Sequence, residues 1–280
     1  MQIAIVTNTK AGSGKAIKLS VKIQEILISK SVQCKIFIET DWDESIYSYS
    51  QAWIVGGDGT VHYFINCFKN IKIPLCIFNG GTGNDFYSLL YGNIDLQSQI
   101  SKVLTSAAKP IDAGRCNECY FLNGVGIGFE GAVAKDLIGV NKFSGKTSFL
   151  FSIIKQIFQY KEQTYIIESR EFKITAKYLM LSIANGTRYG GGFYVAPKAK
   201  PYDGLVDAIL VSPLTPFKRL RYLPVIEKGK HLNLLFIKFF NTQKITIKSD
   251  QIIQAHLDGE YIEDYELSIE ILPSHFNFIY

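Results

Sequence analysis

The sequence predicts two kinds of structure in turn: an α/β domain with a parallel sheet, then a β-rich, antiparallel, sandwich-like domain. Residues 1–90 repeat the order strand, glycine turn, helix three times. This pattern is typical of open parallel sheets, which bind ligands where their strands end. From about residue 111 the apolar segments become short, β-branched and aromatic, with turn residues between them. One strong helical pattern, over residues 147–160, interrupts this second part.

Each strand expected in the first part ends in small and polar residues. The strand Gln2–Thr7 runs into Asn-Thr-Lys-Ala-Gly-Ser-Gly-Lys at 8–15, and a helix follows to about Ser29. The apolar run at 52–55 stops at Gly-Gly-Asp-Gly-Thr, residues 56–60, and a helical pattern follows. The strand at 74–78 leads into Asn-Gly-Gly-Thr-Gly-Asn-Asp-Phe, residues 79–86. Between them we expect a strand at 32–38 and a short helix at 43–50.

The change of pattern predicts a domain boundary near residues 108–113. We expect domains over 1–110 and 111–271, with the extreme C-terminus, about 272–280, packing back on the first. The strands expected in the second domain lie at 120–125, 165–167, 172–176, 178–183, 205–211, 234–240, 244–247 and 267–271.

The composition indicates a globular protein and argues against nucleic-acid-binding, membrane-spanning and disulfide-stabilised classes. A 280-residue chain with 47% hydrophobic residues can bury a large core. The net charge of +5 favours anionic surfaces such as acidic lipid, but it is too small and dispersed to indicate nucleic-acid binding. No apolar stretch reaches the ~20 residues that span a bilayer, and the start of the chain is a strand rather than a signal peptide. Five cysteines, an odd number, favour a reducing cytoplasm over a disulfide framework.

The glycine turn at 56–60 suits a phosphate. Strand, glycine turn and helix N-terminus bring backbone N–H groups to one point, and Asp58 adds a carboxylate where a divalent cation could sit. A tight turn with a helix N-cap would explain Gly-Asp-Gly, but it does not require the flanking Gly56 and Thr60. The turn at 8–15 is not a Walker A loop. Thr9 occupies the position of that motif's first glycine, and Ala16 occupies the position of its magnesium-binding serine or threonine.

Several motifs together resemble the diacylglycerol kinase catalytic-domain family of lipid kinases, within a superfamily that includes sphingosine kinases and NAD kinases. Residues 8–15 look like the family's Asn-Pro-x-x-Gly-x-Gly-Lys, 56–60 are its Gly-Gly-Asp-Gly-Thr, and 81–86 its Gly-Thr-x-Asn-Asp-Phe. Tyr-Gly-Gly-Gly-Phe at 189–193, Asp-Gly-Leu-Val-Asp at 203–207 and Leu-Asp-Gly-Glu at 257–260 are similar to its later motifs. Two departures from the pattern are Thr9 for the usual proline, and His62 and Tyr63 for the usual asparagine and glutamate.

The resemblance implies an ATP-binding first domain and a lipid-substrate second domain, with the triphosphate between them. It implies a catalytic Mg²⁺ near Asp58 and a glutamate proton acceptor, here Glu260. Asp258 and Glu260, two apart in an apparent strand end, should face the same way, so we expect Asp258 to assist. An isolated Asp-Gly-Glu would more often be a turn with a solvated glutamate. The residues implied to bind the nucleotide are Asn8, Gly12, Ser13, Gly14, Thr40, Gly56, Gly57, Asp58, Gly59, Thr60, Thr82, Asn84 and Asp85.

The family also has a structural magnesium loop. Its counterpart here would use the side chain of Asp203 and the carbonyl groups of Lys200 and Leu205, while Asp207 is expected to face solvent. The alternative is a plain turn. Cys116 and Cys119 could suggest zinc, but a single Cys-x-x-Cys pair in an expected hairpin turn is a weak signal.

The lipid side is less defined. The aromatic helix at 147–160, with Lys142 and Phe143 ahead of it, could wall an acyl-chain pocket or simply be core. The segment 216–223 interleaves three cations with apolar residues, which suits an anionic membrane surface, although a solvated amphipathic turn also fits it.

The sequence therefore predicts an ATP- and Mg²⁺-dependent lipid kinase, cytoplasmic and peripherally membrane-associated, that converts diacylglycerol to phosphatidic acid. The alternatives are a kinase for a sphingoid base, a glycolipid or NAD, and a catalytically silent nucleotide- or lipid-binding protein. The oligomeric state is left open, a homodimer included.

Overall fold

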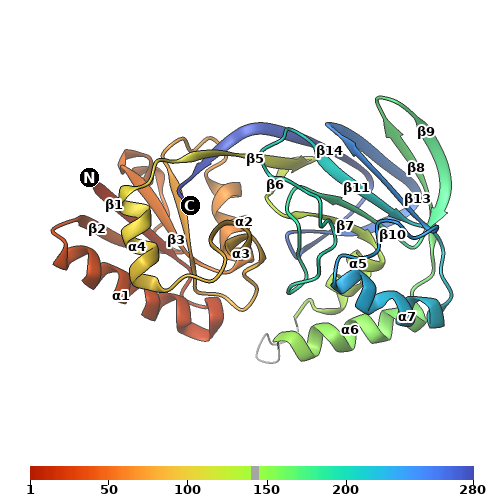
Figure 1. The fold of residues 1–280 in the computed structure, drawn as a ribbon, viewed down its shortest axis with the longest axis horizontal. Coiled ribbons are helices and arrows are strands. Elements are labelled where there is room, and N and C mark those ends of the chain that lie inside the picture. Colours follow the sequence, from red (N-terminus) through yellow and green to blue (C-terminus); the bar gives the residue numbers. More distant parts are fainter. Residues whose placement is uncertain (140–144) are drawn as a thin grey trace. The chain divides into compact units, whose positions relative to one another are not determined.

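The computed structural model describes residues 1–139 and 145–280, and the chain divides into two compact units (Figure 1). Unit 1 comprises Met1–Ile111 and Ser274–Tyr280, and unit 2 comprises Asp112–Pro273. Unit 1 is an α/β unit with a mainly parallel sheet, and unit 2 is built of antiparallel strands with helices. The predicted fold class is confirmed.

Unit 1 holds a parallel sheet in the order β4-β3-β1-β2. Its strands are β1 (Gln2–Thr7), β2 (Gln33–Ile38), β3 (Gln51–Gly56) and β4 (Leu75–Asn79), and its helices are α1 (Lys15–Ser29), α2 (Asp58–Cys67), α3 (Asp85–Tyr91) and α4 (Leu96–Thr105), with short 3-10 helices at Ala11–Gly14 and Glu44–Ser48. Strands β1, β3 and β4 are buried over almost their whole length, as expected for a parallel sheet covered on both faces.

The end of the chain returns to unit 1. Phe278 pairs with Leu75 in parallel at the free edge of β4, and the Ile279 N–H donates to the Leu75 carbonyl at 2.8 Å. The Tyr91 hydroxyl donates to the Ile279 carbonyl at 2.6 Å. These contacts make the last residues part of the core of unit 1.

Unit 2 is built around two long antiparallel strands. Its strands are β5 (Lys109–Cys116, which begins in unit 1), β6 (Cys119–Phe121), β7 (Gly124–Gly128), β8 (Gln163–Ser169), β9 (Lys173–Tyr178), β10 (Met180–Ala184), β11 (Val206–Val211), β12 (Ile237–Thr242), β13 (Lys244–Leu257) and β14 (Glu260–Phe278, which ends in unit 1); its helices are α5 (Phe129–Asp136), α6 (Gly145–Gln159) and α7 (Pro216–Glu227).

Strand β13 changes partner along its length. Its first half pairs with β8 and its second half with β7, and the register of its pairing with β14 shifts between Lys248 and Ile253. A β-bulge at such a shift bends the strand, so one sheet can fold over its own core. That core is a cluster of isoleucine, leucine and aromatic side chains from β7, β8, β10, β11, β13 and β14. A second apolar cluster packs α5 and α6 on the outer face of β10 and β11.

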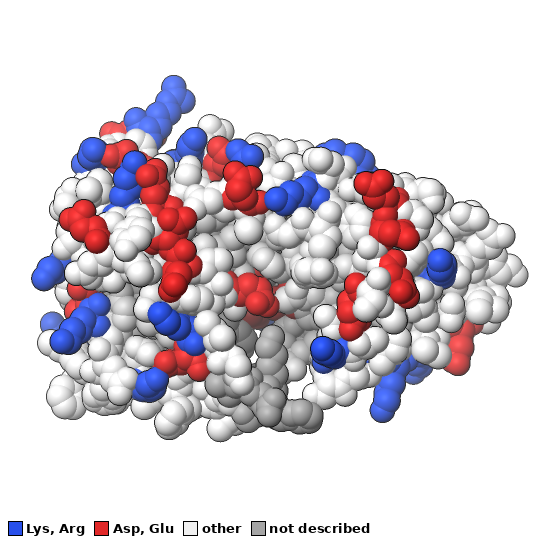
Figure 2. Space-filling model, turned by 180° about the vertical axis from the view of Figure 1, so that it is seen from behind, with Lys and Arg blue, Asp and Glu red and all other residues white. Residues whose placement is uncertain are grey.

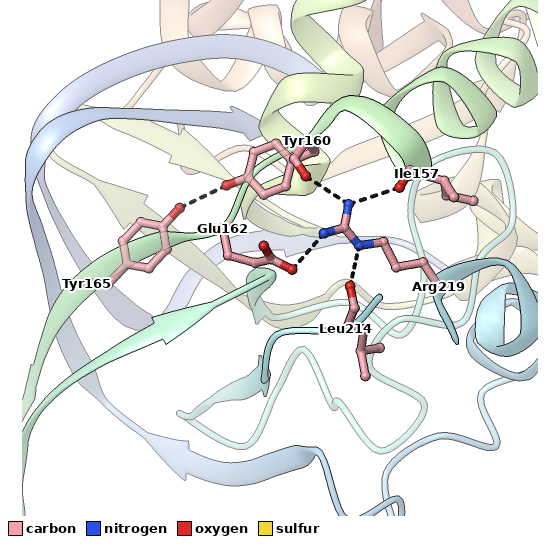
Figure 3. A network of polar contacts seen from close by, with 6 residues as sticks. All are labelled: Ile157, Tyr160, Glu162, Tyr165, Leu214 and Arg219. Carbon is pink, nitrogen blue, oxygen red and sulfur yellow. Dashed lines mark hydrogen bonds and ion pairs between the residues drawn. The ribbon is translucent and has the colours of Figure 1, made fainter. Parts of the chain in front are cut away.

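Helices α6 and α7 are joined by a buried arginine (Figure 3). Arg219 of α7 donates to the carbonyl groups of Ile157 at 3.0 Å and Tyr160 at 2.9 Å, at the C-terminal end of α6, and to Glu162 at 2.6 Å. A cation at this end satisfies carbonyl groups that have no partner within the helix and complements the helix dipole. Arg219 is therefore an internal residue, and the expectation of three surface cations at 216–223 is wrong for this one.

Charges elsewhere are mixed. On the face drawn in Figure 2, lysine and arginine side chains are interspersed with aspartate and glutamate over the described surface. No helix of the described residues is long and apolar enough to cross a membrane.

The 234–240 segment is only partly a strand: β12 begins at Ile237, and Leu235 is fully exposed.

Candidate functional site

Three glycine turns meet in unit 1, at the carboxyl ends of β1, β3 and β4. Parallel pairing places these ends at the same edge of the sheet. The Gly80 N–H donates to the Gly56 carbonyl at 3.0 Å, and the Asp58 N–H donates to the Gly83 carbonyl at 3.1 Å. The second and third turns are thus bonded directly to each other.

The turns approach so closely that they exclude side chains. A Cβ atom at Gly12 would lie 2.3 Å from the Gly80 carbonyl oxygen, and one at Gly81 would lie 2.3 Å from Gly57 Cα. A Cβ at Gly57 would lie 2.6 Å from the Gly83 oxygen. Backbone atoms cannot rotate away, so these positions require glycine for close approach. The three motifs therefore form one continuous backbone surface.

Asp58 holds the second and third turns together. It is the first residue of α2, and its two carboxylate oxygens accept the N–H groups of Asp85 at 2.9 Å and Phe86 at 3.1 Å. The carboxylate therefore caps the start of α3. Each carboxylate oxygen has two acceptor directions, so this role is compatible with a cation ligand.

The first turn is shaped for an anion. Gly12, Ser13 and Gly14 all have left-handed backbone angles, with φ of 57°, 56° and 86°, and α1 begins immediately after them at Lys15. Left-handed residues followed by a right-handed helix form a concave backbone of N–H groups, a nest that binds anions. Ser13 adopts this conformation although it has a side chain, which is uncommon for a residue other than glycine.

Glu39 also supports the first glycine turn, although it belongs to none of the sequence motifs. Its carboxylate accepts the Thr9 N–H at 2.8 Å and also the Thr9 hydroxyl. Although burial alone would raise the pKa of Glu39, the Thr9 hydrogen bonds and nearby Lys10 lower it. A proline at position 9 could not donate this N–H. The departure at Thr9 is thus matched by a local partner at the end of β2.

The remaining residues expected at the nucleotide lie around these turns. The Asn8 side chain accepts the Lys10 N–H at 2.9 Å, and Asn84 donates to the Gly81 carbonyl at 3.0 Å. Thr60 is buried and its side chain packs over Gly56, whereas Thr40 and Thr82 are exposed. Gly59 lies in the first turn of α2.

Two buried side-chain oxygen atoms in unit 1 accept no hydrogen bond from the described residues: Asn79 Oδ1 and Asn84 Oδ1. Buried acceptors of this kind normally have a donor, from protein, water or ligand. Both belong to the third turn and its strand. Backbone donors suited to phosphates and buried acceptors suited to hydroxyl or amino groups together fit a nucleotide.

In unit 2 the Asp-Gly-Glu motif is a hairpin turn and not a strand end. Strand β13 ends at Leu257, β14 begins at Glu260, and Asp258 has a left-handed φ of 50°. Three consecutive N–H groups, of Leu122, Asn123 and Gly124, donate to the Asp258 carboxylate at 2.8, 2.9 and 2.9 Å. The expectation that Asp258 and Glu260 share one face of a strand is therefore wrong. Asp258 anchors the turn, while Glu260 is exposed.

The residues expected to bind structural magnesium line one cavity of ≈ 630 Å³ in unit 2. Lys200, Asp203 and Leu205 all contribute to it, together with Asn241. Asp203 Oδ1 accepts the Leu205 N–H at 3.1 Å, which folds the loop on itself. The structure thus brings the three residues together.

Asp207 does not face solvent, contrary to expectation. It is 3% exposed, Asn241 donates to its Oδ1, and its Oδ2 is buried with no hydrogen bond from the described residues. Burial, and then the neighbouring Asp203 carboxylate, raise the pKa of Asp207 to about 6. Two carboxylates near each other and a buried oxygen without a donor are what a divalent cation would neutralise. These residues fit Mg²⁺.

Other expected features are resolved more simply. Cys116 and Cys119 face each other across the β5–β6 hairpin, and no group of three or more metal-ligating side chains occurs in the described ranges. Lys142 and Phe143 lie outside the described residues. Beside α6, a cavity of ≈ 470 Å³ is lined by residues that include Leu137 and Phe151.

Family models match both parts of the chain. Residues 2–116 match the diacylglycerol kinase catalytic domain, and residues 123–280 match the YegS C-terminal NAD kinase beta sandwich-like domain. Among curated proteins, the chain is 26% identical to "Putative lipid kinase YtlR" of Bacillus subtilis, covering 96% of each chain. It is 26% identical to a "Putative lipid kinase" of Staphylococcus carnosus, over 83% of this chain and 78% of the relative.

Solved structures show the same fold over the whole chain. A crystal structure titled "putative diacylglycerol kinase" from Bacillus anthracis matches with a TM-score of 0.80 and 25% identity, covering 100% of this chain and 96% of the other. An NAD kinase from Archaeoglobus fulgidus, solved in complex with ATP, matches with a TM-score of 0.59 and 18% identity, covering 100% and 94%. At that identity the second match bears on the fold alone.

Proposed function

Because the chain belongs to the diacylglycerol kinase-like family of lipid kinases, with a YegS-type C-terminal domain, we propose that it transfers the γ-phosphate of ATP to the hydroxyl group of diacylglycerol. The observation that carries the nucleotide part is the joined backbone surface of the three glycine turns in unit 1. Phosphoryl transfer depends mainly on positioning and charge neutralisation, which backbone donors and a helix N-terminus provide.

Each residue then has a distinct role. The backbone of residues 12–14 and 56–60 binds the phosphates, and Asp58 holds the second turn against the third while offering an oxygen to the catalytic cation. Magnesium, when bound, would supply charge neutralisation on the phosphates. Glu260 accepts the proton of the lipid hydroxyl. Asp258 fixes the turn that carries Glu260, a positioning role rather than a share in proton transfer.

The acceptor is tested by a labelled-product screen. Purified protein is incubated with labelled ATP and Mg²⁺ against diacylglycerol, a sphingoid base, a glycolipid and NAD, each in matched micelles or buffer. We expect label in phosphatidic acid. If only another product is labelled, the corresponding compound is the acceptor and diacylglycerol is not. If no product is labelled, in the screen or in a total lipid extract, the protein is a catalytically silent binding protein.

The proposed cation site in unit 2 gives a prediction that does not depend on turnover. We propose that Asp203, with the carbonyl groups of Lys200 and Leu205, binds Mg²⁺ and that Asp207 supports it. Because the folded state raises the pKa of Asp207, its contribution to the free energy of unfolding is lost as pH rises from about 4 towards 6 when no cation is present. Mg²⁺ should therefore raise the melting temperature more at pH 7.5 than at pH 5.

Thermal unfolding with EDTA or Mg²⁺ at the two pH values measures this. Asp207→Asn should remove most of the pH dependence of the Mg²⁺ effect, and Asp203→Asn should remove the effect itself. Equal stabilisation of the wild-type protein at both pH values would contradict the prediction.

We propose that the α6–α7 pair contacts the membrane. Phe217 of α7 is 80% exposed and Leu220 is 43% exposed, with Lys218 and Arg221 exposed on the same helix. On α6, Phe151 is 73% exposed. Exposed apolar side chains beside cations suit an anionic bilayer surface, where each cation contributes on the order of 1 kcal/mol.

Vesicle sedimentation tests this surface. Phe217→Ser should lower the affinity for phosphatidylglycerol vesicles roughly 30-fold, since burying one phenylalanine is worth about 2 kcal/mol. Tyr265→Ser is a matched control, because Tyr265 is 57% exposed on β14, away from α6 and α7 in the sequence. Equal losses for the two variants would rule out a specific role for α7.

A further inference from the structure

A row of small and polar residues crosses three neighbouring strands of unit 2. Gly126 of β7 is paired with Ser182 of β10 on one side and with His256 of β13 on the other. Residues paired in this way project to the same face of a sheet. Ser182, Gly126 and His256 therefore form one line on the face that α5 covers through its contacts with β7 and β13.

Glu130 of α5 reaches onto this line. Its Oε2 accepts the Ser182 hydroxyl at 2.9 Å and the Tyr189 hydroxyl at 3.2 Å. Tyr189 belongs to the glycine loop at 189–193, and its ring meets the His256 ring edge-on, with centroids 5.2 Å apart. Burial raises the pKa of Glu130 to about 8, against the effect of these hydrogen bonds. A buried carboxyl group thus joins three elements of unit 2.

The Glu130 and His256 side chains converge over Gly126. The position of a Cβ atom at Gly126 would be 2.3 Å from His256 Nε2 and 2.5 Å from Glu130 Oε2. Because Gly126 has no side chain, the His256 ring and the Glu130 carboxyl group can both occupy the space above it. Any larger residue at 126 would have to displace both.

The other nitrogen of His256 faces the hairpin turn. Its Nδ1 accepts the Gly259 N–H at 3.3 Å, inside the Asp258–Gly259–Glu260 turn. Burial lowers the pKa of His256 to about 4, although nearby Asp258 acts in the opposite direction, so the ring is neutral at pH 7. A neutral ring that accepts at Nδ1 carries its proton on Nε2, the nitrogen directed towards Gly126 and Glu130.

We propose that Glu130 and His256 are positioning residues for the turn that carries Glu260. Glu130 fixes the His256 ring over Gly126, and the ring in turn holds the Gly259 N–H. The turn thus has two supports: Asp258 on the N–H groups of Leu122, Asn123 and Gly124, and His256 on its own glycine. The effect on turnover rests on the proposed role of Glu260, whereas the effect on the turn does not.

Two variants of His256 separate its two contacts. Asparagine can place an acceptor near the position of Nδ1, and glutamine can place a polar group near that of Nε2. We expect His256→Asn to keep the Gly259 amide protected from hydrogen exchange, and His256→Gln to make it exchange roughly 5-fold faster, the effect of one lost hydrogen bond. Nuclear magnetic resonance of the full chain measures this amide directly.

Gly126→Ala tests the link to Glu130 without deleting a polar group. The added methyl group should separate His256 from Glu130, so that the Gly259 amide exchanges faster and kcat for lipid phosphorylation falls roughly 10-fold. Because the nucleotide turns lie in unit 1, we expect the KM for Mg-ATP to stay unchanged. Melting temperatures of all variants show whether any loss reflects unfolding.

The outcomes are distinct. Identical Gly259 exchange in His256→Asn and His256→Gln, or wild-type exchange in Gly126→Ala, would overturn the inference. If the wild-type protein phosphorylates no lipid, the proposed function fails, and the exchange rates still decide whether Glu130 and His256 support the turn.

Discussion

Replacing Glu260 with glutamine should lower kcat for lipid phosphorylation by roughly 10²- to 10⁴-fold, the usual contribution of a general base. Glutamine keeps the size and polarity of the side chain but cannot accept a proton. Glu260 is exposed at the first position of β14, so the substitution should leave the fold intact. The affinity for Mg-ATP should also stay near that of the wild-type protein. Initial rates with diacylglycerol micelles and calorimetric ATP binding measure the two quantities.

Glu266→Gln is the matched control. Glu266 lies on the same strand and pairs with Lys248 at 3.0 Å on the surface, a type of ion pair worth little. Its loss should change neither rate nor affinity appreciably. Residual activity of Glu260→Gln close to that of Glu266→Gln would show that Glu260 is not the proton acceptor.

Gly81→Ala should lower the affinity for ATP by about 100-fold or more. A methyl group at Gly81 would lie 2.3 Å from Gly57 Cα and 2.5 Å from Gly57 N, so the second and third turns must move apart. A displacement near 1 Å is enough to remove most of the benefit of a preorganised site. The expected loss is in binding, and calorimetry with ATP and Mg²⁺ detects it.

The same loop supplies the comparison. At Gly83 a methyl group would meet only Asp58 Oδ2, at 3.3 Å, so the carboxylate would have to shift by a few tenths of an ångström while its hydrogen bond to the Asp85 N–H is kept. Gly83→Ala should therefore weaken binding much less than Gly81→Ala. If both proteins bind ATP as the wild type does, the joined turns are not the nucleotide site. Circular dichroism shows whether either variant is still folded.

The sequence was a good guide where local pattern decides structure. Strand–turn–helix units with buried strands specify a parallel sheet, and glycines at the strand ends place the turns at one edge. Both parts of the predicted fold are observed, and the family expected from the motifs is the family that the comparisons give.

What could not be predicted depends on tertiary pairing. Asp258 and Glu260 have the spacing of strand neighbours, and only the register of β13 with β14 shows that a turn separates them. Asp207 is polar and follows a turn motif, yet it lies opposite Asn241 of the neighbouring strand β12, which donates to its carboxylate. In the sequence, Arg219 cannot be told apart from the exposed cations near it. Only the fold shows that it bonds to the C-terminal end of α6. Glu39 and Glu130 belong to none of the motifs considered, and only the folded chain shows their partners.

The return of the last residues to unit 1 bears on how the protein is made. During synthesis, residues 112–273 of unit 2 leave the ribosome before Phe278, whose ring packs on Phe86 of unit 1 with centroids 5.6 Å apart. The nascent first unit therefore lacks this edge strand until residue 278 has been made. A chain that stopped before residue 274 would contain every motif but an incomplete unit 1.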